Sequence, residues 1–132
     1  MITRREIVTA ALAIAATGVQ AQSHGHSHAA PNGGQIVNIG KFEVELVATR
    51  QEIRLYLTDE NEKKLPSSDF AATATVLAQG NQQRTVELKP TGDNVLSGKY
   101  DFAIEGKFRA TVSLKSKDKE LGRGRFNTDL KK

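Results

Sequence analysis

Apolar and polar side chains alternate with a period of two over most of the chain after residue 40. The alternation is clearest in residues 42–48, 53–58, 70–78 and 108–115, where one set of alternate positions is apolar and the other is polar. A strand points successive side chains to opposite faces, so this pattern predicts strands with one buried and one solvated face. No stripe of helical spacing competes with it in this part of the chain, and half-buried strands of this kind are typical of antiparallel sheets.

Shorter runs predict further strands at 35–39, 82–88, 95–97 continuing at 100–104, and 121–127. Segments rich in Gly, Asn, Asp and Pro separate them and predict turns, among them residues 90–94. The longest connection, residues 59–69, contains Pro66 and is expected to cross between sheets. These elements predict an all-β fold, a small antiparallel β-sandwich of immunoglobulin-like type with seven or eight strands, with a small barrel as the alternative.

The first 21 residues have the three parts of a cleavable export signal. Arg4 and Arg5 precede a short apolar segment, and Val19 and Ala21 supply the small residues of a cleavage site. The apolar segment is too short to span a bilayer as a finished helix, so no membrane span is expected in the mature chain. We therefore predict a signal peptide at 1–21 and a periplasmic protein, with the Sec and twin-arginine routes both open.

The predicted mature chain divides into three parts. Residues 22–33 lack large apolar side chains and predict a flexible tail, residues 34–128 contain the predicted strands, and residues 129–132 form a basic end. The 132-residue sequence has no cysteine, so the domain must be held by its core instead of by disulfides. Its basic residues are scattered and nearly balanced by acidic ones, a pattern that argues against nucleic acid as a partner.

All three histidines of the chain lie in the tail, at positions 24, 26 and 28. Neutral imidazole is a common ligand for divalent transition metals, and histidines on a short segment can wrap one ion. Cleavage after Ala21 would leave Gln22 at the new terminus with His24 in third position. The Gln22 amine, two backbone nitrogens and His24 then form a square-planar site suited to Cu(II) or Ni(II).

That terminal site depends on the cleavage position and on a Gln22 that does not cyclise, whereas His26 and His28 remain ligands in either case. The alternative is that the segment is a polar linker that happens to contain histidine. The only methionine is Met1, so the mature chain has no sulfur ligand for Cu(I).

The predicted domain carries little catalytic chemistry. It has neither histidine nor cysteine, so Ser-His, Cys-His and ordinary zinc catalytic sites are excluded there, and neither an enzyme nor an organic cofactor is expected. Glu43 and Glu45 share one strand face, which we interpret as solvated, with a weak cation site as the alternative. The Gly-Arg-Gly-Arg sequence at 122–125 is interpreted as an edge strand protected by charge.

Several segments, together with the histidine-bearing tail, carry a resemblance to a known family. They are residues 30–37 (APNGGQIV), 42–47 (FEVELV), 55–59 (LYLTD), 72–77 (ATATVL) and 86–94 (VELKPTGDN). The chain resembles small periplasmic proteins associated with heavy-metal efflux systems, and is similar to an N-terminal domain of resistance-nodulation-division metal-efflux adaptor subunits. The resemblance implies a β-sandwich and a role in handling copper, zinc, cobalt or nickel. Relatives often have a histidine before the glycine pair, where this chain has Asn32.

These observations predict a periplasmic protein that captures Cu(II), Ni(II) or Zn(II) on its histidine tail and is accessory to heavy-metal efflux or resistance. The expected partners are the metal ion and a periplasmic efflux adaptor. The alternative is a metal-independent interaction module whose sheet edge docks onto a partner protein.

Overall fold

The computed structural model describes residues 30–131, and the predicted signal peptide together with Gln22, His24, His26 and His28 lies outside this range. Among the described residues no helix is long and apolar enough to cross a membrane. Two short 3-10 turns, η2 (Ser67–Asp69) and η3 (Gln79–Asn81), accompany eight strands. The strands are β1 (Gln35–Ile39), β2 (Phe42–Ala48), β3 (Glu52–Thr58), β4 (Ala71–Ala78), β5 (Gln82–Gly92), β6 (Val95–Lys99), β7 (Phe108–Ser116) and β8 (Lys119–Thr128). The predicted all-β class is confirmed.

The strands bury the faces that the alternation predicts. In β3, Ile53, Leu55 and Leu57 are fully buried, and in β7 the inward positions begin with Phe108, the largest fully buried side chain. These residues join inward side chains of the other strands in one hydrophobic core. Burial of such side chains is the main source of stability available to a domain without disulfides.

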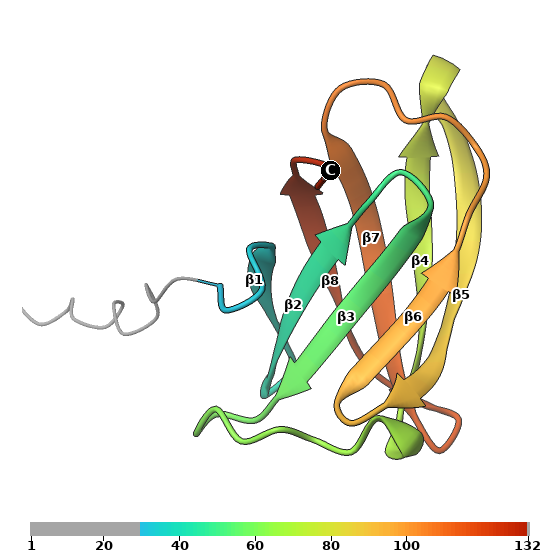
Figure 1. Cartoon of the computed structure of the whole chain (residues 1–132). Helices are drawn as coiled ribbons and strands as arrows, with labels where there is room; N and C mark the ends of the chain where they lie inside the picture. Colours follow the sequence, from blue (N-terminus) through green and yellow to red (C-terminus); the bar gives the residue numbers. More distant parts are fainter. Residues whose placement is uncertain (1–29, 132) are drawn as a thin grey trace, which may run out of the picture.

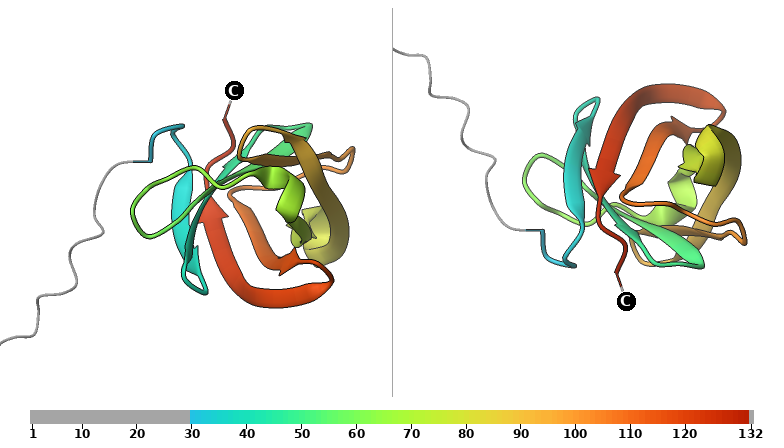
Figure 2. Two further views of the ribbon diagram at one scale, coloured as in Figure 1. Left: turned by 90° about the horizontal axis from the view of Figure 1, so that it is seen from below. Right: turned by 90° about the horizontal axis from the view of Figure 1, so that it is seen from above.

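All strand pairs are antiparallel, and they form one continuous sheet with the order β1-β2-β3-β6-β5-β4-β7-β8. Viewed along the strands, the sheet curls around the core into a nearly closed barrel (Figure 2). The expected two-sheet sandwich is therefore not what the chain forms. The reason is β5, whose first part pairs with β4 and whose last part, Lys89 to Gly92, pairs with β6. This long strand joins the two halves that a sandwich would keep separate.

Two local predictions were also wrong. Residues 90–92 belong to β5 and not to a turn, with a register shift between Pro90 and Gly92 where the strand bends. Residues 100–104 form no strand, because this segment crosses from β6 to β7 over one end of the barrel (Figure 1). The 59–69 connection was expected to cross between two sheets; it instead joins β3 to β4, which are not neighbours within the one sheet.

The barrel closes where the two edge strands β1 and β8 lie side by side (Figure 2). The backbone N–H of Asn127 donates to the side-chain carbonyl of Gln35 at 2.7 Å, and Gly124 faces Ile39. A Cβ at Gly124 would lie 2.8 Å from Cγ1 of Ile39, closer than side-chain atoms approach one another. The glycines of the 122–125 sequence thus allow β1 to pack tightly on β8, while Arg123 and Arg125 of the same sequence are exposed.

Tyr100 fastens the crossing segment to the β2–β3 turn. Its hydroxyl donates to the carbonyl of Thr49, and its backbone N–H donates to the carbonyl of Gln51 at 2.9 Å. Tyr100 is buried, with 7 % of its surface exposed, and its ring packs against Phe102 and Phe108 at centroid distances of 4.7 and 6.2 Å. Burial raises the pKa of Tyr100 above its ordinary value of 10.0.

We predict that Tyr100→Phe lowers the free energy of unfolding by about 0.5–1.5 kcal/mol, because the half-buried Thr49 carbonyl loses the hydrogen bond from the Tyr100 hydroxyl. The raised pKa stabilises the folded state fully below about pH 10, and this contribution is lost as pH rises through the folded-state pKa. Urea unfolding from pH 8 to 11 measures both effects. The variant should lose less stability above pH 10 than the wild type, and equal slopes would contradict this assignment.

Candidate binding cleft

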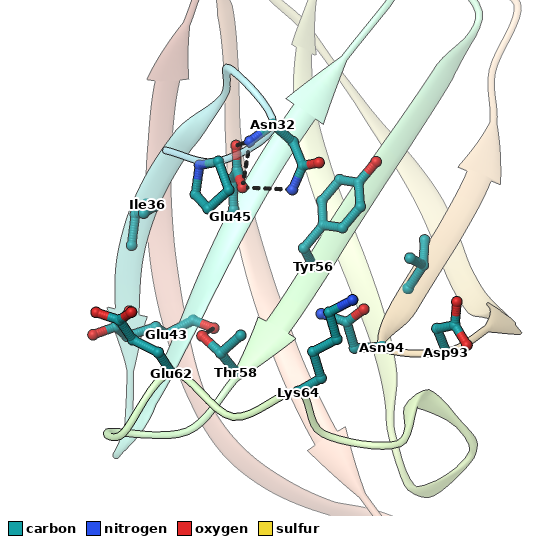
Figure 3. Close-up of a pocket in the computed structure, with 12 residues that line it drawn as sticks. Asn32, Ile36, Glu43, Glu45, Tyr56, Thr58, Glu62, Lys64, Asp93 and Asn94 are labelled. Atoms are coloured by element: carbon teal, nitrogen blue, oxygen red, sulfur yellow. Dashed lines mark hydrogen bonds between the residues drawn. The ribbon is translucent and has the colours of Figure 1, made fainter. Parts of the chain in front are cut away.

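A cleft of about 380 Å³ lies on the outer face of the barrel over β1, β2, β3 and β6 (Figure 3). Its floor is one row of outward side chains set by strand register: Ile36 pairs with Glu45, Glu45 with Tyr56, and Tyr56 with Val95. Glu43 and Thr58 form the next pair along the same face. Strand pairing thus brings residues from four separate segments into one surface.

Glu45 is the buried charge of the cleft, with only 4 % of its surface exposed. The turn that precedes β1 folds over it. The backbone N–H of Asn32 donates to Oε2 of Glu45 at 2.9 Å, the Asn32 side-chain amide donates to Oε1 at 2.9 Å, and the backbone N–H of Gly34 donates to Oε2 at 2.8 Å. These bonds to a carboxylate are the stronger, charge-assisted kind.

The sequence interpretation of Glu43 and Glu45 as a solvated face is therefore wrong for Glu45. Both side chains point outward from β2, as the alternation predicts, but the Asn32–Gly34 turn covers Glu45. Gly34 permits this, because a Cβ there would collide with the backbone carbonyl of Leu46. The Asn-Gly-Gly sequence at 32–34 predicts a turn. The local pattern does not show that this turn covers Glu45, which lies thirteen residues after Asn32.

The other wall of the cleft comes from the β3–β4 connection and the β5–β6 turn. Asp59 caps the start of the connection, since its side chain accepts from the backbone N–H of Asn61 at 2.8 Å and of Lys63 at 2.9 Å. Asn94 holds the β5–β6 turn in place: its buried side chain donates to the Leu57 carbonyl at 3.0 Å. These contacts position Glu62, Lys64 and Asp93 around the opening (Figure 3).

The lining of the cleft is acidic. Four carboxylates, Glu43, Glu45, Glu62 and Asp93, share it with one ammonium group, that of Lys64. Clustered charges of one sign on a concave surface attract counter-ions and raise their local concentration. Within residues 30–131, however, no group of three or more His, Asp or Glu side chains is placed to hold a metal ion. The arrangement therefore favours cations without forming a coordination site.

The cleft adjoins the point where the described chain begins. Pro31 and Asn32 are part of its lining, and Glu45 fixes Asn32 in place. His28, the last of the three predicted metal ligands, precedes Asn32 by only four residues in the sequence. The hydrogen bonds of Glu45 thus set where the histidine-bearing tail joins the barrel.

Comparison of this chain with known protein families, with curated proteins and with solved structures finds no match.

We predict that Glu45→Gln lowers the free energy of unfolding by about 1–3 kcal/mol, since three donors lose a charged acceptor and one of them is left facing an amide N–H₂ group. Chemical denaturation of wild type and variant measures the loss. Glu60→Gln removes the same charge from the exposed β3–β4 connection and should leave stability unchanged within about 0.5 kcal/mol. Equal effects of the two substitutions would contradict the role given to Glu45.

Proposed function

We propose that this chain is a periplasmic metal-binding protein that captures Cu(II), Ni(II) or Zn(II) through His24, His26 and His28. In the mature form that begins at Gln22, the terminal amine and His24 provide a square-planar site that favours Cu(II) or Ni(II). His26 and His28 act as further imidazole ligands. The protein binds and carries its ion and does not catalyse a reaction.

The observation that supports this proposal is that the histidine segment ends, in the sequence, four residues before Asn32, which lines an acidic cleft. Asn32, held by Glu45, is both the end of the tail and part of the cleft lining. A divalent cation approaching the histidines would experience the negative potential of Glu43, Glu62 and Asp93. The imidazoles are the strong ligands, and the carboxylates increase the rate at which the metal ion encounters them.

We further propose that the barrel presents the loaded tail to a periplasmic adaptor of a heavy-metal efflux system. Support comes from the sequence resemblance and from the hydrogen bond that holds Asn32, four residues after His28 in the sequence, to Glu45 of the barrel. The rival function, docking through a sheet edge, needs an accessible edge strand. The two edge strands β1 and β8 lie against each other, and this supports the metal-binding function over edge docking.

We predict that the variant His24→Ala/His26→Ala/His28→Ala loses high-affinity Cu(II) and Ni(II) binding, because no other imidazole exists in the chain. Isothermal titration calorimetry of the processed, untagged protein measures affinity, and native mass spectrometry gives the stoichiometry and the terminus. Ser23→Ala/Ser27→Ala alters the same segment but keeps all three histidines, so it should bind as the wild type does. Unchanged affinity in the triple histidine variant would refute the proposal.

We predict a smaller, salt-dependent effect for the cleft. Glu62→Gln/Asp93→Asn should slow Cu(II) association about two- to fivefold at 10 mM salt and have almost no effect at 500 mM, where screening is strong. Stopped-flow mixing measures the rate. Glu105→Gln/Asp101→Asn makes the same charge change in the segment over the opposite end of the barrel and should leave the rate unchanged (Figure 1). If Cu(II) association of the variant is still slower at 500 mM salt, the carboxylates act as metal ligands.

A further inference from the structure

The β7–β8 hairpin carries an excess of positive charge that the metal-binding function does not use. Residues 107–128 contain two acidic side chains, Asp118 and Glu120, and seven basic ones: Lys107, Arg109, Lys115, Lys117, Lys119, Arg123 and Arg125. Residues 30–106, by contrast, contain eleven acidic and eight basic side chains. The barrel therefore has one basic hairpin, and its two strands contribute no residue to the lining of the acidic cleft.

A groove of about 370 Å³ crosses the outer face of this basic region, from β5 over β4, β7 and β8 to the start of β1. Two arginines, Arg109 and Arg125, line it, and no aspartate or glutamate does. Arg109 pairs with Asn127, and Thr111 pairs with Arg125, so the two arginines are diagonal neighbours on the same face. Ordinary sheet geometry puts such positions about 7–8 Å apart, within reach of one ligand for side chains of this length.

Within the part of the chain that the structure describes, no side chain neutralises either guanidinium. Among residues 30–131, Arg109 and Arg125 have neither an ion pair nor a side-chain hydrogen bond, whereas Arg123 on the same strand is paired with Glu120 at 2.9 Å. The two positive charges on one face therefore remain available to an anion from solution.

The remaining polar groups of the groove complement an oxyanion. Thr75 and Thr111 contribute hydroxyl groups, and Asn127 contributes a side-chain amide. The side-chain carbonyl of Gln35 already accepts from the Asn127 backbone N–H, which leaves the Gln35 amide nitrogen as a donor. The guanidinium group of arginine matches the geometry of two phosphate oxygens. Nearby hydroxyl and amide donors can form hydrogen bonds with the other phosphate oxygens.

We infer that this groove binds a phosphate group, with Arg109 and Arg125 as its charged ligands and Thr75, Thr111, Gln35 and Asn127 as neutral ones. The chemistry is the same for a free phosphate compound and for the phosphate of an anionic lipid headgroup. The site is independent of the proposed metal ligands, which lie on the other side of the Asn32 anchor in the sequence.

The test uses the full mature chain with two probes: pyrophosphate in calorimetry, and phosphatidylglycerol vesicles in a flotation assay, with phosphatidylcholine vesicles as the neutral control. Arg109→Gln/Arg125→Gln should weaken binding of the responsive probe about ten- to a hundredfold, as expected for lost charge-assisted hydrogen bonds. Both side chains are exposed, so the fold should persist, and circular dichroism checks this. Arg123→Gln, already paired with Glu120 and outside the groove, is the matched control and should change affinity less than threefold.

Binding of pyrophosphate that depends on the arginine pair identifies a soluble phosphate compound as the source. Binding restricted to phosphatidylglycerol vesicles, with the same dependence, identifies a headgroup. No binding of either probe overturns the inference, and so does an equal loss in Arg123→Gln, which would mean diffuse attraction to a basic surface. Metal titration of Arg109→Gln/Arg125→Gln should match the wild type.

Discussion

The structure depends on the close approach of β1 to β8, which brings the two edges of one curled sheet together. Gly124 makes this possible, since it leaves room for Ile39 where any side chain would collide. This approach protects both edge strands and places Gln35, at the start of β1, beside Asn127 of β8. The turn before β1 is then in position to fold over Glu45, and the arginines of β8 face outward. The two candidate sites themselves are set by strand register, the cleft by the pairing of β1, β2, β3 and β6 and the arginine pair by the pairing of β7 and β8.

The two surfaces differ in whether their charged side chains have partners within the protein. In the cleft, the buried Glu45 accepts hydrogen bonds from Asn32 and Gly34 and so holds the turn before β1 in place. In the groove, Arg109 and Arg125 have no protein partner among the described residues. A satisfied buried charge positions the chain, whereas an unsatisfied exposed pair is available to a ligand. The anchoring carboxylate and the arginine pair thus lie on different strands, and neither arginine lines the cleft.

Sequence reasoning succeeded where local periodicity reports directly on burial. Ile53, Leu55 and Leu57 were identifiable as core positions because alternate residues of a strand face opposite sides. It failed at β5, where Pro90 and Gly92 suggest a turn but the strand continues through a bend. It also failed for Tyr100, whose neighbours read as a strand although its hydrogen bonds go to the β2–β3 turn. Turn-forming residues and strand-forming residues have preferences that tertiary contacts override.

The all-β class, most of the strands and the clustering of all three histidines before the domain can be predicted from the sequence, because each is a property of neighbouring residues. That one sheet curls into a nearly closed barrel, and that Glu45 is buried by a turn eleven to thirteen residues away, depends on tertiary contacts. That Arg109 and Arg125 share a groove likewise depends on them. Strand order and register bring distant residues together, and no local pattern encodes them.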